Sequence, residues 1–420
     1  MLLLTNTIGR LFTQAPVFFM AVACWGQLAE EGQRRMSVGD FAGAVGVYEQ
    51  LVQQAPGNPG WKLNLGIALH MAGRDKEAVG PLTVAAGAMP LAFPAHALLG
   101  TSLLRLGQAA KAVVPLQRAV AMKPADPQGR RMLAEAFLQS GQPKLAVVQL
   151  AALTRLEPND AGAWFVLGRA NEGAAEQAFQ ALAKQFPESR AFVLTTAAVR
   201  KKQRRLKAAA ALEEQARTRP PLARADALAR EIETFSDGAL RAFKQLGALP
   251  DNPQLHKIKA ETLRAQGKHL EAVEEWRLAL RFDPRDRDTE RELAASLYAG
   301  SQYLEALNTL ERLLVHDPDS AVLHFLKGDC LLQQGQAEEA IGPLLKALSI
   351  LPARASLGRA LLAVGRGAEA VPHLEASVAA LDTDGALYFQ LSRAYQMAGL
   401  ADKAAGALAE SQKRRVDAQQ

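Results

Sequence analysis

The chain contains 420 residues, of which 49% are hydrophobic and 6% aromatic, and its formal net charge at pH 7 is +6. The hydrophobic content is ample for a buried core, and two cysteines in this length exclude a scaffold held together by disulfides. Alanine and leucine dominate and no alternating strand pattern persists, which predicts a nearly all-α protein.

The first 24 residues, MLLLTNTIGRLFTQAPVFFMAVAC, carry one charge and an apolar run from Ala15 to Cys24. The run is too short to span a bilayer and suits the apolar region of a secretory signal. We therefore predict a signal peptide over residues 1–23, cleaved after Ala23, and a bacterial protein that is exported to the periplasm or secreted. A cytoplasmic chain is the alternative. Cys24 resembles the lipid-modified cysteine of bacterial lipoproteins, so a membrane contact is expected only through a lipid anchor there.

From Gly39 onward, residues of the same type recur at a fixed step of 34 residues. Self-similarity at such a step predicts stacked repeats, in which no single unit buries its own apolar face. The recurring residues are Gly39, Gly73, Gly107 and Gly141; Ala44, Ala78, Ala112 and Ala146; Pro56, Pro90, Pro124 and Pro158; and farther on Ala272, Ala306 and Ala340 with Pro284, Pro318 and Pro352.

Residues 93–126 show what one repeat predicts. Leucines at steps of four and three indicate a first helix, and Gly107 ends it because glycine adopts the left-handed conformation of a C-cap. A second apolar set begins at Ala112, which is small enough for two antiparallel helices to cross closely. Pro124 ends the second helix, since proline has no N–H to donate.

This pattern resembles the tetratricopeptide repeat (TPR). In residues 93–126 the family positions are His96, Leu99, Gly100, Leu103, Gly107, Ala112, Leu116, Ala119 and Pro124. The resemblance extends in register over most of the chain and implies an all-α, right-handed α-solenoid of about twelve antiparallel helix pairs.

The repeat-ending prolines change their spacing after Pro158, falling at Pro187, Pro221, Pro250 and Pro284 in steps of 29, 34, 29 and 34 residues. We expect the five-residue loss to shorten the turn or the helices and to bend the stack. The predicted parts are therefore the signal peptide at 1–23, an N-terminal array at 24–160, an irregular basic segment of degenerate repeats at 161–251, and a C-terminal array at 252–420.

The irregular segment also concentrates positive charge, including six cations within eight positions: Arg200, Lys201, Lys202, Arg204, Arg205 and Lys207. Such a run attracts an acidic protein, anionic lipid or nucleic acid, or it is a solvated helix end without a ligand. Nucleic acid is the least favoured ligand because no aromatic residues are interleaved for base stacking.

No catalytic or cofactor motif is present. No two histidines have the four-residue spacing of a helical zinc pair, and there is no phosphate-binding loop, G-x-S-x-G elbow or C-x-x-C. His96, His256 and His324 share one repeat position and are interpreted as packing residues, and Cys330 as a small buried hydrophobic residue. We therefore expect a protein that is not an enzyme and that holds no cofactor or metal.

The TPR resemblance implies that the first helices line a concave groove. Arginine and aromatic residues, which contribute most to binding at interfaces, recur on them. The groove candidates are Leu63, Ile67, His70, Met71, Arg105, Arg131, Phe165, Arg169, Phe325, Arg359, Phe389 and Arg393. The recurrence of arginine favours acidic or carboxylate-bearing protein and peptide partners.

The function predicted is a non-catalytic scaffold or adaptor that binds protein partners in this groove. The alternative is a regulatory or targeting subunit of an enzyme complex, for example one for cell-envelope modification or assembly. A more distant alternative is a nucleic-acid-associated factor that works through the basic run.

Overall fold

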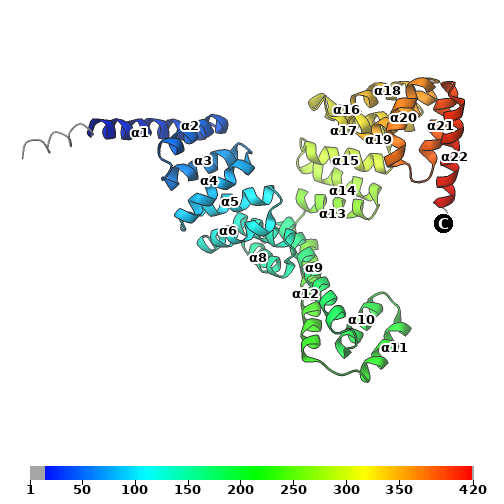
Figure 1. The fold of residues 1–420 in the computed structure, drawn as a ribbon. Coiled ribbons are helices and arrows are strands. Elements are labelled where there is room, and N and C mark those ends of the chain that lie inside the picture. The colour runs from blue at the N-terminus through cyan, green and yellow to red at the C-terminus, as the bar shows by residue number, and fades with distance from the viewer. Residues whose placement is uncertain (1–14, 419–420) are drawn as a thin grey trace, which may run out of the picture. The chain divides into compact units, whose positions relative to one another are not determined.

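The computed structural model describes residues 15–418, with side chains from Gly26 onward, and these residues form helices without any strand (Figure 1). Contacts divide the chain into two units, Met1–Leu249 and Pro250–Gln420. The all-α class and the stack of helix pairs are thereby confirmed. The described residues form 22 helices, which is two fewer than twelve pairs require.

The first unit opens with four regular helix pairs. Each turn between the two helices of a pair contains a glycine with a positive φ, between 69° and 79°, which is the role predicted for Gly107. The helices are α1 (Ala15–Ser37) and α2 (Phe41–Gln54), α3 (Pro59–Met71) and α4 (Asp75–Ala88), α5 (Phe93–Arg105) and α6 (Ala109–Met122), and α7 (Pro127–Gln139) and α8 (Pro143–Leu156).

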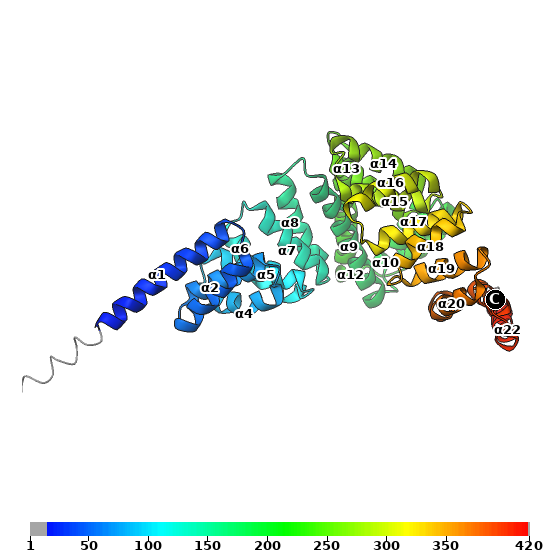
Figure 2. The same ribbon diagram turned by 90° about the horizontal axis from the view of Figure 1, so that it is seen from above.

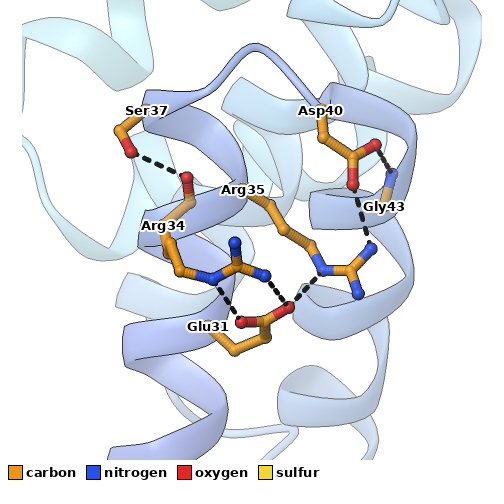
Figure 3. A network of polar contacts seen from close by, with 6 residues as sticks. All are labelled: Glu31, Arg34, Arg35, Ser37, Asp40 and Gly43. Carbon is orange, nitrogen blue, oxygen red and sulfur yellow. Dashed lines mark hydrogen bonds and ion pairs between the residues drawn. The ribbon is translucent and has the colours of Figure 1, made fainter.

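Charged side chains hold the turn between α1 and α2 (Figure 3). Asp40 caps α2 by accepting from the Gly43 backbone N–H at 2.9 Å, and it also accepts from Arg35 at 3.0 Å. Arg34 and Arg35 both donate to Glu31 and lower the pKa of that carboxyl to about 2. Contacts between residues close in sequence, namely a helix cap and an ion network, therefore set the geometry of this first turn.

In four of the pairs, a glycine on the first helix lies against a leucine on the second, and α7 has Ala134 at this position. A Cβ on Gly100 would lie 2.4 Å from Leu116 Cγ, and one on Gly66 would lie 2.5 Å from Leu82 Cγ. Ala112 is fully buried at the same crossing. Only glycine and alanine leave room for the two backbones to approach so closely.

One position near the start of the first helix binds several repeats to the loop before them. His96 Nε2 lies 3.1 Å from the Pro90 carbonyl, Trp164 Nε1 donates to the Pro158 carbonyl at 2.8 Å, and Arg130 Nε donates to the Pro124 carbonyl at 2.7 Å. His324 repeats the contact, and His96, His256 and His324 are buried. The interpretation of these histidines as packing residues is confirmed.

The segment with 29-residue spacing forms an arm instead of ordinary pairs. Two 25-residue helices, α9 (Ala161–Gln185) and α12 (Ala223–Gly247), run side by side and carry the hairpin of α10 (Arg190–Lys202) and α11 (Leu206–Arg217) at their far end (Figures 1 and 2). The five-residue loss removes the turn, so two expected helices fuse into one in each short unit. This fusion accounts for the two helices fewer than twelve pairs would give.

The inner half of the arm completes one repeat from two distant segments. A Cβ on Gly168 of α9 would lie 2.5 Å from Phe243 Cε1 of α12, and the rings of Phe165 and Phe243 lie 6.3 Å apart. The end of α12 thus takes the place of the second helix that α9 lacks. A small apolar cluster holds the hairpin, formed by buried Leu182, Ala191 and Ala225.

The second unit contains five further pairs. Its irregularity lies in α18, which has 10 residues where the other second helices of this unit have 14 or more, so the following repeat starts four residues early. The helices are α13 (Pro253–Ala265) and α14 (His269–Phe282), α15 (Arg287–Ala299) and α16 (Tyr303–His316), α17 (Ala321–Gln333) and α18 (Ala337–Lys346), α19 (Leu351–Ala363) and α20 (Gly367–Leu381), and α21 (Ala386–Met397) and α22 (Ala401–Asp417).

The predicted signal peptide falls largely outside the described part of the chain. Residues 1–14 and the side chains of Ala23 and Cys24 are not described, so cleavage and lipid attachment stay predictions. Over the residues that are described, no helix is both long enough and apolar enough to cross a membrane.

Candidate functional site

The predicted groove residues all lie on the first helix of a pair: Leu63, Ile67, His70 and Met71 on α3, Arg105 on α5, Arg131 on α7, Phe165 and Arg169 on α9, Phe325 on α17, Arg359 on α19, and Phe389 and Arg393 on α21. Met71 is 49% exposed and Phe389 is 38% exposed. The others differ in what they contact, and these contacts decide which of them are free to meet a partner.

His70 is the clearest correction, because its side chain is buried between repeats and does not face outward. Its Nδ1 lies 2.8 Å from both Asp75 Oδ1 and Ser102 Oγ. Burial acts to raise the pKa of Asp75, but hydrogen bonds from Ser102 and His70 prevail and lower it. The sequence pattern predicted the helix of His70 correctly, but it did not show that Asp75 binds the His70 side chain between the repeats.

This serine, histidine and aspartate do not form a hydrolytic triad. In a triad the serine and the aspartate lie on opposite nitrogens of the imidazole, so that one nitrogen takes the serine proton while the aspartate orients the ring through the other. Here both contact Nδ1, and all three side chains are buried. Within the described residues, no three His, Cys, Asp or Glu side chains are grouped to hold a metal ion.

The arginines on the first helices are mostly neutralised by carboxylates of the chain itself. Arg131 pairs with Asp160 at 2.5 Å, Arg169 with Glu172 at 2.5 Å, and Arg359 with Asp329 at 2.9 Å. Arg105 lies 3.5 Å from Asp75, whereas Arg393 contacts the amide of Gln390. These contacts compensate part of the positive charge of the row, and an acidic partner for it stays a prediction.

A buried carboxylate links three successive first helices in the second unit. Asp329 on α17 is 2% exposed and accepts from the Tyr298 hydroxyl of α15 at 2.8 Å. It also accepts from Ser356 and Arg359 of α19, at 2.5 and 2.9 Å. Burial raises the pKa of Tyr298 and, with Asp329 nearby, that of Cys330 to about 12. The contacts of Asp329 therefore hold Arg359, a member of the predicted groove row, against the neighbouring repeats.

The arm contains a hollow that the sequence did not predict. Two adjoining cavities of about 680 and 880 Å³ share Thr195 and Val199 of α10 and Ile232 of α12 among their lining residues. The apolar side chains that line them include Leu194, Val199, Ile232, Leu240, Phe179 and Phe243. Leu194 and Leu240 remain 40% and 69% exposed. The hollow exists because α12 returns along α9, and a one-dimensional repeat pattern does not show that return.

Charged side chains surround this apolar surface. Five carboxylates and three cations line the cavities, namely Glu172, Glu176, Asp226, Glu233 and Asp237 with Arg169, Lys202 and Arg230. Arg169 belongs to the predicted groove row, so that row meets the hollow at α9. An apolar surface with an excess of carboxylates complements a segment that has one apolar face and basic flanks.

The predicted basic residues lie together at the α10–α11 turn, on the outer end of the arm. Lys201, Lys202, Arg204, Arg205 and Lys207 are exposed, and Lys201 pairs with Glu213. Arg200 is half-buried. Of the six, Lys202 alone lines the hollow, so the basic run and the hollow are two separate surfaces of the arm.

Family models of the tetratricopeptide repeat match residues 35–99, 103–170 and 291–355 of this chain. These stretches contain regular helix pairs, and the second of them ends in the inner half of α9. No curated protein sequence matches the chain significantly.

Solved structures with partial similarity include a crystal structure of MamA, which is 22% identical over 36% of this chain and 81% of its own, with a TM-score of 0.34. MamA of Desulfovibrio magneticus RS-1 is 23% identical over 35% and 83% of the two chains, with a TM-score of 0.33. YrrB, described as a TPR protein with an unusual peptide-binding site, is 19% identical over 51% and 88%, with a TM-score of 0.32. Similarity at this level says nothing about what this chain binds.

Proposed function

Because this chain is a tetratricopeptide repeat protein, we propose that it is a non-catalytic scaffold that binds a segment of a partner protein in the hollow of its arm. In the regular repeats the apolar side chains at helix crossings are covered by the next helix. Single leucines are exposed in the regular repeats too, such as Leu304, but Leu194 and Leu240 lie with other apolar side chains around the two adjoining cavities and are partly open to solvent. This uncovered apolar surface is the observation that carries the proposal.

The proposed occupant is an amphipathic helical segment of another protein, with one apolar face and basic flanks. Its apolar face would cover Leu194, Ile232 and Leu240, and each large apolar side chain so buried contributes about 1.5–3 kcal/mol. Its basic flanks would meet the rim, where carboxylates outnumber cations by five to three. The excess of carboxylates orients the segment so that its basic flanks meet the rim, and it accelerates association of the segment with the arm.

The lining of the hollow supports a binding role and not a catalytic one. Its polar members are Thr195, Ser236 and the charged rim, and no histidine or cysteine is among the residues that line the two cavities. Acyl transfer by serine needs a neighbouring base within hydrogen-bond reach. Ser236 has no histidine in this set to serve as that base.

The test compares partner capture by the full-length protein and by two matched variants. Leu240→Asp places a charge on the hollow, whereas Leu304→Asp does so on α16, at a leucine of similar exposure (69% and 66%). Affinity capture with mass spectrometry is expected to lose a partner with Leu240→Asp and to keep it with Leu304→Asp. Capture of the same partners by all three proteins would contradict the assignment of the hollow.

A further inference from the structure

The outer end of the arm concentrates positive charge to a degree found nowhere in the regular repeats. The hairpin, residues 190–219, contains nine Lys and Arg residues but only two Asp and Glu residues. Both carboxylates belong to α11, where Glu213 pairs with Lys201 and Glu214 with Arg217. The cations at the turn itself therefore face solvent with little internal compensation.

The turn departs from the glycine pattern of most repeats, as the α15–α16 turn also does, where Ser301 has a φ of +60°. Arg204 has a φ of +56°, at the turn position where eight other repeats place glycine with φ between 69° and 82°. An L-residue with a side chain is disfavoured in this left-handed region. The chain thus keeps arginine where glycine would fold more easily, and this points to a role outside the hairpin.

The start of α11 adds to the positive charge of the turn. Arg205 occupies the N-cap and Lys207 lies in the first turn, at the positive end of the helix dipole. The first turn of α11 contains no acidic residue, as in α2, α6 and α8, whereas those of α4, α14, α16, α18, α20 and α22 do. Anionic groups placed against this turn would relieve the repulsion between its cations.

An exposed leucine lies between these cations. Leu206 is 66% exposed and is flanked in sequence by Arg205 and Lys207. Of the six cations only Lys202 lines the hollow, and the others lie exposed or half-buried around the turn. The partner that this surface fits is extended, anionic at its surface and apolar beneath it.

We propose that residues 200–207 form a docking tip for an anionic phospholipid surface, whose headgroup phosphates bind the exposed cations while Leu206 enters the acyl boundary. Cations near an anionic membrane and an inserted apolar side chain act together in peripheral attachment. Duplex nucleic acid would satisfy the charges but would leave Leu206 in water, and residues 200–207 contain no aromatic side chain to stack on the bases of a single strand. The tip shares Lys202 with the lining of the hollow, but the proposal is carried by the other cations and by Leu206, none of which lines the hollow.

The experiment is co-sedimentation of the full chain with vesicles of phosphatidylcholine alone and with vesicles that also contain phosphatidylglycerol. The readout is the difference between the two, because the apolar N-terminal run would bind both kinds alike. Arg204→Glu with Arg205→Glu is expected to lower partition onto anionic vesicles by roughly 30-fold or more, since each cation near the surface is worth about a factor of five. Lys76→Glu with Arg118→Glu, which makes the same charge change at exposed residues of α4 and α6, should leave it unchanged.

Two further measurements distinguish lipid from other polyanions. Leu206→Ser should weaken vesicle binding while leaving binding to soluble polyglutamate and duplex DNA as it was. If circular dichroism shows that the charge reversal unfolds the hairpin, Arg205→Gln with Lys207→Gln replaces it, with the same expected direction. Equal binding to neutral and anionic vesicles, binding that survives the tip substitutions, or competition by DNA together with no effect of Leu206→Ser would each overturn the proposal.

Discussion

Gly168 on α9 packs directly against the ring of Phe243 on α12, with space for no Cβ between them. In a regular repeat the same glycine meets the leucine of the very next helix, as Gly100 meets Leu116. The contact shows that one repeat is assembled from the two ends of the arm, and that the intervening residues extend outward from it. The hollow and the basic tip both follow from this arrangement.

We predict that Gly168→Val destabilises the first unit, because the new side chain would have to displace the Phe243 ring. Overpacking of this kind costs about 1–3 kcal/mol, which thermal unfolding followed by circular dichroism measures. Gly80→Ala is the control, since no atom lies within 4 Å of its Cβ position in α4. That change should stabilise by roughly 0.5–1 kcal/mol. A neutral Gly168→Val would mean that the two long helices do not pack as described.

Replacing Arg204 with glycine should stabilise the hairpin. Glycine adopts the left-handed φ of this turn without the penalty of about 1–2 kcal/mol that an L-residue bears. Hydrogen exchange measures the effect locally, and amides of α10 and α11 should exchange more slowly in the variant. The same variant should bind anionic vesicles less well, so stability and lipid binding move in opposite directions. Faster exchange in the variant would contradict the strain inferred at Arg204.

The ion pair between Lys257 and Asp286 should contribute stability that disappears in acid. Lys257 Nζ lies 2.5 Å from Asp286 Oδ2, and this contact lowers the pKa of the Asp286 carboxyl from 3.8 to about 2. A lowered carboxyl pKa stabilises the folded state above the unfolded-state pKa, and the gain is lost as the pH falls from about 4 to 2. Lys257→Met should therefore be less stable than the wild type at pH 7, with a gap that closes below pH 2.

Urea unfolding as a function of pH measures this gap. Lys259→Met, at an exposed lysine two residues away on α13, is the matched control and should show no pH-dependent difference from the wild type. A gap of constant size across the acidic range would assign the effect of Lys257 to packing of its side-chain stem and not to its charge.

We further propose that the chain is exported and cleaved after Ala23, on the evidence of its apolar N-terminal run. Intact-mass analysis of protein made in a bacterial host should give a chain that begins at Cys24, with added acyl mass if that cysteine is lipidated. Serine at position 24 should abolish any acyl mass without changing the cleavage of an ordinary signal. Recovery of the uncleaved chain from the cytoplasm would contradict export.

The regular parts of the fold could be predicted because each repeat carries its own signals for ending helices. Gly107, at a φ of +69°, follows the end of α5, and Pro124 follows the end of α6. Proline alone does not decide the end of a helix, because Pro115 lies inside α6. The arm could not be predicted in the same way. The five-residue loss was evident, but whether it shortens a turn or fuses two helices depends on α12 returning to cover α9, which is a contact between distant segments.

The candidate surfaces show the same limit. The pattern placed Arg131 and Arg359 on the first helices correctly, yet their partners Asp160 and Asp329 lie on neighbouring repeats. Helical periodicity reports which face a side chain occupies and not which charge lies opposite it. His70 was assigned to the open face for the same reason, although Asp75 and Ser102 hold it inside.

The most direct test of the central claim is site-specific photocrosslinking in the full-length protein, with benzoylphenylalanine in place of Leu240 and, as the control, in place of Leu304. Both side chains are about equally exposed, at 69% and 66%, but only Leu240 lines the hollow. We predict an adduct specific to position 240, whose crosslinked peptide is an amphipathic helical segment of another protein with basic flanks. No adduct at position 240, or the same adducts at both positions, would contradict the account of this chain as a scaffold that binds its partner in the arm.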